Sequence, residues 1–197
     1  MRLTKNLLYI LGLLTLVVFG LLGRFLLMYF HEQEVMDLVM GKYPIWIQGV
    51  AGLGFGTIAA LLATQIINAK FFASVKEFFA DIFGGLHLNI LDIAYLSICA
   101  GIGEELFFRG ALQPWLGIWL TALIFIAVHG YLNPRNWRMS VYGVAMVVVS
   151  AGLGYLYQFL GMFSAMVAHA SFDFVLLYIF IRNESTGIQD SKTSTED

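Results

Sequence analysis

Hydrophobic residues fill six long segments of the chain, and short polar stretches separate them. An apolar run of about 20 residues, folded as an α-helix, is long enough to cross the hydrocarbon core of a bilayer. The pattern therefore predicts six transmembrane helices, at about Leu7–Tyr29, Pro44–Ile67, Leu86–Pro114, Trp115–Tyr131, Met139–Leu160 and Met162–Ile181. In the second segment, Gly52 and Gly56 form a G-x-x-x-G pattern, which lets a neighbouring helix approach closely.

Two further segments differ from these six. In Lys70–Phe83, phenylalanines alternate with Lys76, Glu77 and Asp81 at helical spacing, a pattern typical of an amphipathic helix in the membrane interface. Gly84 and Gly85 are expected to end this helix. Residues 183–197 are rich in Ser, Thr, Asp and Glu. They predict a disordered polar tail after an integral membrane, protease-like domain of residues 1–182.

The composition supports a membrane protein. The chain is 59% hydrophobic and only 12% charged, whereas soluble domains carry about 25% charged residues. We therefore expect an all-α fold, a polytopic helical bundle of about six transmembrane helices surrounded by the lipid bilayer. The net charge of −2, with no basic block, argues against a nucleic-acid partner. The single Cys99 lies inside a predicted span, and we interpret it as a core residue.

The distribution of Lys and Arg predicts the orientation of the chain. With a cytoplasmic N-terminus, the outer loops hold Lys42, while Arg24 and Arg109 lie inside spans. The inner segments then hold the remaining basic residues, Arg2, Lys5, Lys70, Lys76, Arg135, Arg138, Arg182 and Lys192. Because positive charge collects on the cytoplasmic side of cell-membrane proteins, we expect a multi-pass protein with both termini in the cytoplasm.

Three ionisable side chains lie close together in residues 101–109 of the third apolar segment. Glu104, Glu105 and Arg109 stand in a run that is otherwise apolar. A charge at the bilayer centre costs roughly 2.5–3.5 kcal/mol even on the mildest scales, so such residues point to function. On a helix, Glu105 and Arg109 are four residues apart and form a favourable pair, while Glu104 is left without a local partner. A purely structural ion pair is the alternative interpretation.

Three more polar residues lie in later spans: His129 in the fourth, and His169 with Asp173 in the sixth. His169 and Asp173 are one helical turn apart and share a face. Phe125 lies one turn before His129 and is expected to pack beneath its ring. The joint pattern is hard to explain by packing, and it indicates a reactive centre inside the membrane.

Two kinds of hydrolytic chemistry fit these residues. In one, Glu104 takes a proton from water, His129 orients that water, and His169 polarises a carbonyl oxygen. In the other, Glu104, His129 and His169 bind zinc and leave one position open for water. Spacing alone does not choose between no cofactor and zinc.

The order of these motifs resembles that of the CPBP family (CAAX protease and bacteriocin-processing, or Abi) of intramembrane proteases. The motifs are Glu104-Glu105-x-x-x-Arg109, Phe125-x-x-x-His129 and His169-x-x-x-Asp173. The resemblance implies that Glu104 and His129 activate the attacking water. It implies that Glu105 and Arg109 hold the site together, and that His169 and Asp173 stabilise the oxyanion. The family has been described both as zinc metalloproteases and as metal-free glutamic proteases, so the resemblance leaves the metal open.

Asp173 departs from the pattern of the eukaryotic prenyl-protein proteases of this family, which have Asn there. An amide donates a hydrogen bond to an oxyanion, whereas an ionised carboxylate only accepts. Asp173 must be protonated, bind a metal, or accept from His169 and keep that ring charged; we favour the last. The departure also weakens a prenylated C-a-a-X peptide as the expected substrate.

We therefore expect an intramembrane endopeptidase that cuts a membrane-anchored protein or peptide near its apolar anchor. A non-catalytic protein of the same fold, such as a bacteriocin-immunity or scaffold protein, is the main alternative, although it has no need of Glu104, His129 and His169. A proton- or metal-coupled transporter also places acids and histidines in spans, but the sequence shows no inverted repeat.

The predicted spans place the three residues at different depths. At 1.5 Å per residue, Glu104 and His169 lie roughly 10–14 Å below the outer surface and His129 roughly 20 Å below it. A single reactive centre needs all three at one depth. We therefore expect either shifted helix boundaries or a bend of the chain near Gln113–Trp115.

Overall fold

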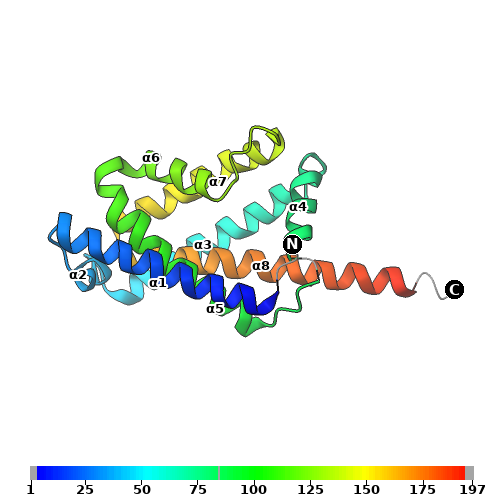
Figure 1. Ribbon diagram of the computed structural model, residues 1–197, viewed down its shortest axis with the longest axis horizontal. Coiled ribbons are helices and arrows are strands. Elements are labelled where there is room, and N and C mark those ends of the chain that lie inside the picture. Colours follow the sequence, from blue (N-terminus) through cyan, green and yellow to red (C-terminus); the bar gives the residue numbers. More distant parts are fainter. Residues whose placement is uncertain (1–3, 84, 194–197) are drawn as a thin grey trace.

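The computed structural model describes residues 4–83 and 85–193, and every regular element within these ranges is a helix (Figure 1). The predicted all-α fold class is confirmed. Five helical stretches in the described residues are long and apolar enough to cross a membrane: Lys5–Phe30, Ile45–Asn68, Ile90–Val128, Trp137–Phe159 and Met162–Asn183. The elements in chain order are α1 (Lys5–Phe30), α2 (Val35–Met40), α3 (Ile45–Asn68), η1 (Lys70–Phe72), α4 (Ala73–Phe83), α5 (Ile90–Glu105), the π-helix η2 (Leu106–Leu112), α6 (Gln113–Val128), α7 (Trp137–Phe159) and α8 (Met162–Thr193).

The number of spans differs from the expected six because the predicted third and fourth spans form one stretch. Elements α5, η2 and α6 follow one another without a loop. Gly117 breaks this stretch with a φ of 73°, a conformation that residues with a Cβ rarely adopt. The expected bend therefore exists, but it lies at Gly117, beyond Pro114. The part of α6 after Gly117 is about 16 Å long at 1.5 Å per residue, so it reaches through about half of a hydrocarbon core.

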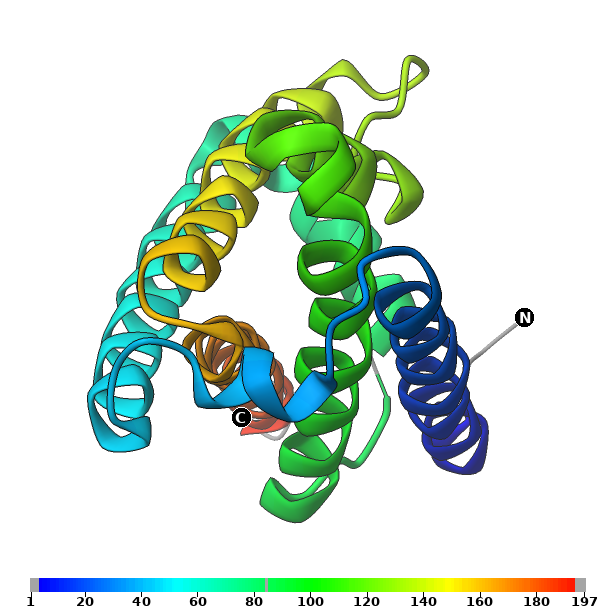
Figure 2. The same cartoon turned by 90° about the vertical axis from the view of Figure 1, so that its left-hand side faces the viewer.

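The long helices alternate in direction. α1 and α5 run the same way, since Lys5 pairs with Asp92 at their starts. α8 lies between α3 and α5 in the end-on view of Figure 2 and contacts both. It runs opposite to α5, because Gly110 in η2, just after the end of α5, lies beside Met162 at the start of α8. After Gly117, α6 turns back alongside α7 (Figure 1). The short part of α6 after Gly117 thus replaces the fourth of the six predicted spans.

The contact between α3 and α8 depends on the two glycines of the G-x-x-x-G pattern. A Cβ added at Gly52 would lie 2.4 Å from the backbone oxygen of Ser164. A Cβ added at Gly56 would lie 2.1 Å from the backbone oxygen of Ala168. The predicted close helix approach is confirmed, and it fixes α8, which carries His169, against the bundle.

The two segments outside the spans are also helical where the structure describes them. η1 and α4 cover the predicted amphipathic segment, with Val75 buried and Lys76 and Glu77 exposed. Gly84, one of its two expected end points, lies outside the described residues. α8 continues to Thr193, into the segment for which we expected disorder. Residues 194–197 lie outside the described residues, and the division at residue 182 stays a prediction.

Candidate active site

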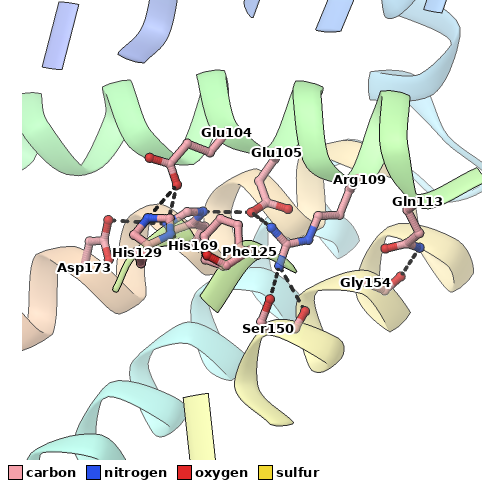
Figure 3. A network of polar contacts seen from close by, with 10 residues as sticks. All are labelled: Glu104, Glu105, Arg109, Gln113, Phe125, His129, Ser150, Gly154, His169 and Asp173. Carbon is pink, nitrogen blue, oxygen red and sulfur yellow. Dashed lines mark hydrogen bonds and ion pairs between the residues drawn. The ribbon is translucent and has the colours of Figure 1, made fainter. Parts of the chain in front are cut away.

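A buried hydrogen-bond network joins α5, η2, α7 and α8 (Figure 3). Glu105 Oε1 accepts from Arg109 Nη1 at 2.9 Å and lies 2.7 Å from His169 Nδ1. Arg109 Nη2 donates to the backbone oxygen and the hydroxyl oxygen of Ser150, at 3.0 and 2.7 Å. The side chains of Glu105 and Arg109 are 0% and 1% exposed, so each charge depends on the other. The predicted Glu105–Arg109 pair is confirmed.

Glu105 also fixes the orientation of the His169 ring. An ionised carboxylate only accepts hydrogen bonds, so the imidazole Nδ1 facing Glu105 carries a proton. The other ring nitrogen, Nε2, then points away from the pair. It lies 3.5 Å from Asp173 Oδ2 and 3.9 Å from Glu104 Oε2. His169 and Asp173 thus lie within ion-pair distance one helical turn apart, and the role of Asp173 as an acceptor from His169 stays a prediction.

Phe125 lies between the arginine and the second histidine. Its ring centroid is 4.6 Å from the guanidinium carbon of Arg109 and 4.4 Å from the ring centroid of His129. The backbone oxygen of Phe125 also accepts from His129 Nδ1 at 2.7 Å. The predicted packing of Phe125 beneath His129 is therefore confirmed. With Nδ1 held by the backbone, His129 Nε2 is free to face Glu104, at 3.4 Å.

Glu104 is the acid at the centre of the arrangement. Its Oε2 atom is buried and has no hydrogen-bond partner in the described part of the chain. The Nε2 atoms of His129 and His169 both face this oxygen (Figure 3). The three residues lie on α5, on α8 and immediately after α6, and the bend at Gly117 returns α6 to the depth of Glu104. The expected difference in depth is thus removed.

The Glu104 carboxylate opens on a cavity of about 140 Å³. His129, His169 and Asp173 line the same cavity, together with Tyr131. A second cavity of about 420 Å³ lies between α3, α4 and α8, and apolar side chains form most of its wall. Tyr131, Asp173 and Leu176 line both cavities, so the two cavities are adjacent.

The zinc alternative was tested against the arrangement of the donor atoms. No group of three or more His, Cys, Asp or Glu side chains is placed to hold a metal ion among residues 4–83 and 85–183. Glu104 Oε2 lies 3.4 and 3.9 Å from the two imidazoles, and His169 Nε2 also faces Asp173. The side chains as placed do not form a metal site, so we derive no chemical step through zinc.

The sequence interpretation missed several contributors to this site. Ser150 on α7 binds Arg109, and Gly154, one turn later, accepts from Gln113 Nε2 at 3.1 Å. Two patterns in the sequence point to these contacts. Gln113 continues the i,i+4 row of Glu105 and Arg109, and the small residues Ser150 and Gly154 have the same spacing on α7. Tyr131, which directly follows the His129-Gly130 pair, was also missed.

A comparison with known protein families matches the region of the chain that contains the candidate site. Residues 86–175 match the family described as type II CAAX prenyl endopeptidase Rce1-like. All six candidate site residues lie inside this range. No solved structure matches the chain.

A curated relative matches beyond this region. The chain is 36% identical over 154 residues to the uncharacterized protein YpbD of Bacillus subtilis, an alignment that covers 74% of this chain and 76% of the relative. The match extends over most of both chains, and the family match contains every motif of the polar network. The chain therefore belongs to the Rce1-like type II CAAX prenyl endopeptidase family, as its motif order predicted.

Proposed function

We propose that this protein is an intramembrane endopeptidase whose attacking water is held between Glu104 and His129. One observation carries the proposal: the buried Glu104 Oε2 has no hydrogen-bond partner in the described residues and faces two imidazole nitrogens in a cavity. A buried carboxylate without a partner is costly unless another molecule hydrogen-bonds to it. A water in the cavity supplies that bond and is the nucleophile.

The two acceptors orient this water. Because His129 Nδ1 donates to the Phe125 backbone oxygen, the neutral ring presents an unprotonated Nε2. Glu104 and His129 Nε2 then accept the two hydrogens of one water molecule. This arrangement turns a lone pair of the water oxygen toward the rest of the cavity, where a substrate carbonyl binds.

In the proposed hydrolysis, Glu104 carries one proton from the attacking water to the leaving amine. The water oxygen bonds to the carbonyl carbon, the π electrons of the C=O bond move to its oxygen, and Glu104 takes a water proton. The tetrahedral intermediate then re-forms the C=O bond and breaks the C–N bond, while Glu104 returns the proton to the amine nitrogen. The products are a carboxyl group and an amine. His169 polarises the carbonyl oxygen, and Glu105 with Arg109 holds that ring in place.

The larger cavity indicates the class of substrate. Its wall is mostly apolar, residues of α4 form part of it, and it shares Asp173 and Tyr131 with the catalytic cavity. We propose that it holds the apolar part of a membrane-anchored protein or peptide and brings a neighbouring peptide bond to Glu104. The family is described by prenyl substrates, so a lipid-modified peptide is one such molecule.

We also propose that the protein is a multi-pass cell-membrane protein with both termini in the cytoplasm. The positive-inside distribution supports this orientation. The alternating helix directions, with the return of α6 after Gly117, bring the start of α1 and the end of α8 to the same side of the bundle. Accessibility labelling of single cysteines at either end, in intact and opened cells, tests this orientation.

The decisive experiment compares wild type, Glu104→Gln and Glu77→Gln in membrane vesicles. Two reporters are supplied: a peptide with a single transmembrane anchor and a prenylated C-terminal peptide, with fragments identified by mass spectrometry. Glu77 is an exposed carboxylate on α4 and provides the matched control. We expect wild type and Glu77→Gln to cut the same bond, and Glu104→Gln to cut it at least about 100-fold more slowly, the typical contribution of a general base.

Each other outcome has a definite meaning. Equal cleavage by Glu104→Gln contradicts the role of Glu104 as the general base. A wild-type protein that cuts neither reporter contradicts the proposal and points to the non-catalytic alternative. Cleavage that a chelator abolishes and zinc restores assigns the water to a metal instead.

A further inference from the structure

The proposed reaction leaves the developing oxyanion short of hydrogen-bond donors. Acyl-transfer sites commonly aim two donors at this oxygen. An ionised Asp173 cannot donate, because a carboxylate only accepts. His169 contributes at most Nε2, and that atom already faces Asp173 and Glu104, at 3.5 and 3.9 Å. A second donor must come from elsewhere in the cavity wall.

Three residues that carry a hydroxyl group line the catalytic cavity: Ser150, Tyr131 and Tyr142. The Ser150 hydroxyl oxygen accepts from Arg109 at 2.7 Å, and Ser150 lines the catalytic cavity but not the larger one. Tyr142 is only 1% exposed and lines the catalytic cavity but not the larger one. Tyr131 lines both cavities, so it lies where a bound substrate passes from the apolar cavity to the carboxylates.

The end of α6 fixes Tyr131 beside His129. Gly130 has a φ of 78°, and its N–H donates to the backbone oxygen of Ala127 at 3.0 Å. The N–H of Tyr131 donates to the backbone oxygen of Ile126 at 3.3 Å. These two bonds form a Schellman motif, which ends the helix and turns the chain back on itself. As a result the rings of Tyr131 and His129 lie parallel, with 3° between their planes and 6.2 Å between their centroids.

The surroundings of Tyr131 keep its hydroxyl protonated. Burial raises the pKa of Tyr131 above its ordinary value, and the nearby Tyr142, Asp173 and Glu104 raise it further. The group therefore remains a donor over the whole neutral range. Tyr131, Asp173 and Glu104 also line the same cavity.

We propose that Tyr131 is a further catalytic residue, whose hydroxyl donates a hydrogen bond to the carbonyl oxygen of the substrate as that oxygen becomes negative. This inference rests on the proposed function. It assigns the electrophilic role to a neutral donor from the loop after α6, in place of an amide at position 173. No proton leaves the tyrosine, because its hydrogen bond only stabilises the charge that the attack of water creates.

The test is the reporter assay with Tyr131→Phe, which removes one oxygen and keeps the ring. We expect kcat to fall about 100-fold with KM changed less than about threefold, the pattern for a donor that acts mainly in the transition state. Tyr155→Phe is the matched control, since Tyr155 lies on α7 outside both cavities and stacks on Phe159. Circular dichroism and thermal unfolding in detergent check that each variant is folded.

A fluorinated tyrosine at position 131 distinguishes a donor role from a purely structural role through the pH dependence of activity. Its hydroxyl is more acidic, so the alkaline loss of activity is expected at lower pH than in the unmodified protein. Unchanged kcat in Tyr131→Phe, a rise in KM alone, or an unmoved pH profile overturns the inference while wild type still cleaves. A wild-type protein that cleaves neither reporter overturns the proposed function and this inference with it.

Discussion

Glu105 and His169 are 64 positions apart in the chain, yet Glu105 Oε1 lies 2.7 Å from His169 Nδ1. This contact joins two motifs that the sequence shows separately. Through this contact Glu105 orients the His169 imidazole, whose other nitrogen, Nε2, faces Glu104.

The variant Glu105→Gln tests this orienting role. The amide keeps an oxygen for His169 but loses the charge that holds the ring, so we expect cleavage to fall roughly 10- to 100-fold, by analogy with partners that orient metal-site histidines. Cleavage rates and KM with the membrane-anchored reporter provide the measurement. Full activity in a folded Glu105→Gln protein would contradict the orienting role.

The Glu105–Arg109 pair predicts a non-additive effect on stability. Removing one charge leaves the other buried without its partner, so we expect Glu105→Gln and Arg109→Met each to lower stability by about 3 kcal/mol. The double variant leaves no unpaired charge and is expected to lose less than the sum of the two. Unfolding in mixed detergent micelles measures all three proteins. Strict additivity would show that the two residues do not act as a pair.

Two neighbouring glycines on α3 give a matched test of helix packing. Gly56→Ala places a Cβ 2.1 Å from the backbone oxygen of Ala168, whereas a Cβ at Gly54 meets nothing within 4 Å. We expect Gly56→Ala to lower stability by roughly 1–3 kcal/mol, the usual effect of overpacking, and Gly54→Ala to leave it unchanged. Thermal unfolding in one detergent compares the two. Equal effects would mean that α3 and α8 are not in close contact.

The bend at Gly117 predicts a loss of activity from a residue outside the polar network. Gly117→Ala strains a backbone with a φ of 73°, at a cost of about 1–2 kcal/mol, and we expect α6 to shift and carry His129 away from Glu104. Gly20→Ala, in open space on α1, is the control. The reporter assay should show reduced kcat for the first variant only. Wild-type kcat in Gly117→Ala would argue that the bend does not position His129.

Asp173 offers a rescue experiment for the proposed donor. In the double variant Tyr131→Phe with Asp173→Asn, the new amide supplies a donor in the same cavity, at the position where prenyl-protein proteases of this family have Asn. We expect this protein to recover part of the kcat lost in Tyr131→Phe alone. Kinetics of both proteins under identical conditions measure the recovery. A double variant slower than Tyr131→Phe would count against the donor role.

The features that depend on local spacing could be read from the amino-acid sequence. Apolar runs of sufficient length predicted the helices, and residues four apart on a helix share a face, which gave the pairs Glu105–Arg109 and His169–Asp173. The G-x-x-x-G pattern likewise predicted a close helix contact at Gly56, because a missing side chain is visible in the sequence. Each of these inferences needs only the periodicity of one helix.

Which helix faces meet, and at what depth, follows from the packing of the helices in three dimensions. The positive φ of Gly117 turns α6 back, so His129 meets Glu104 although its span was expected to place it deeper. Helix packing brought Ser150 to Arg109, and the Gly130 turn brought Tyr131 to the cavity. These relationships depend on helix ends, bends and packing between distant segments, whose energies come from contacts that hydrophobic periodicity does not encode.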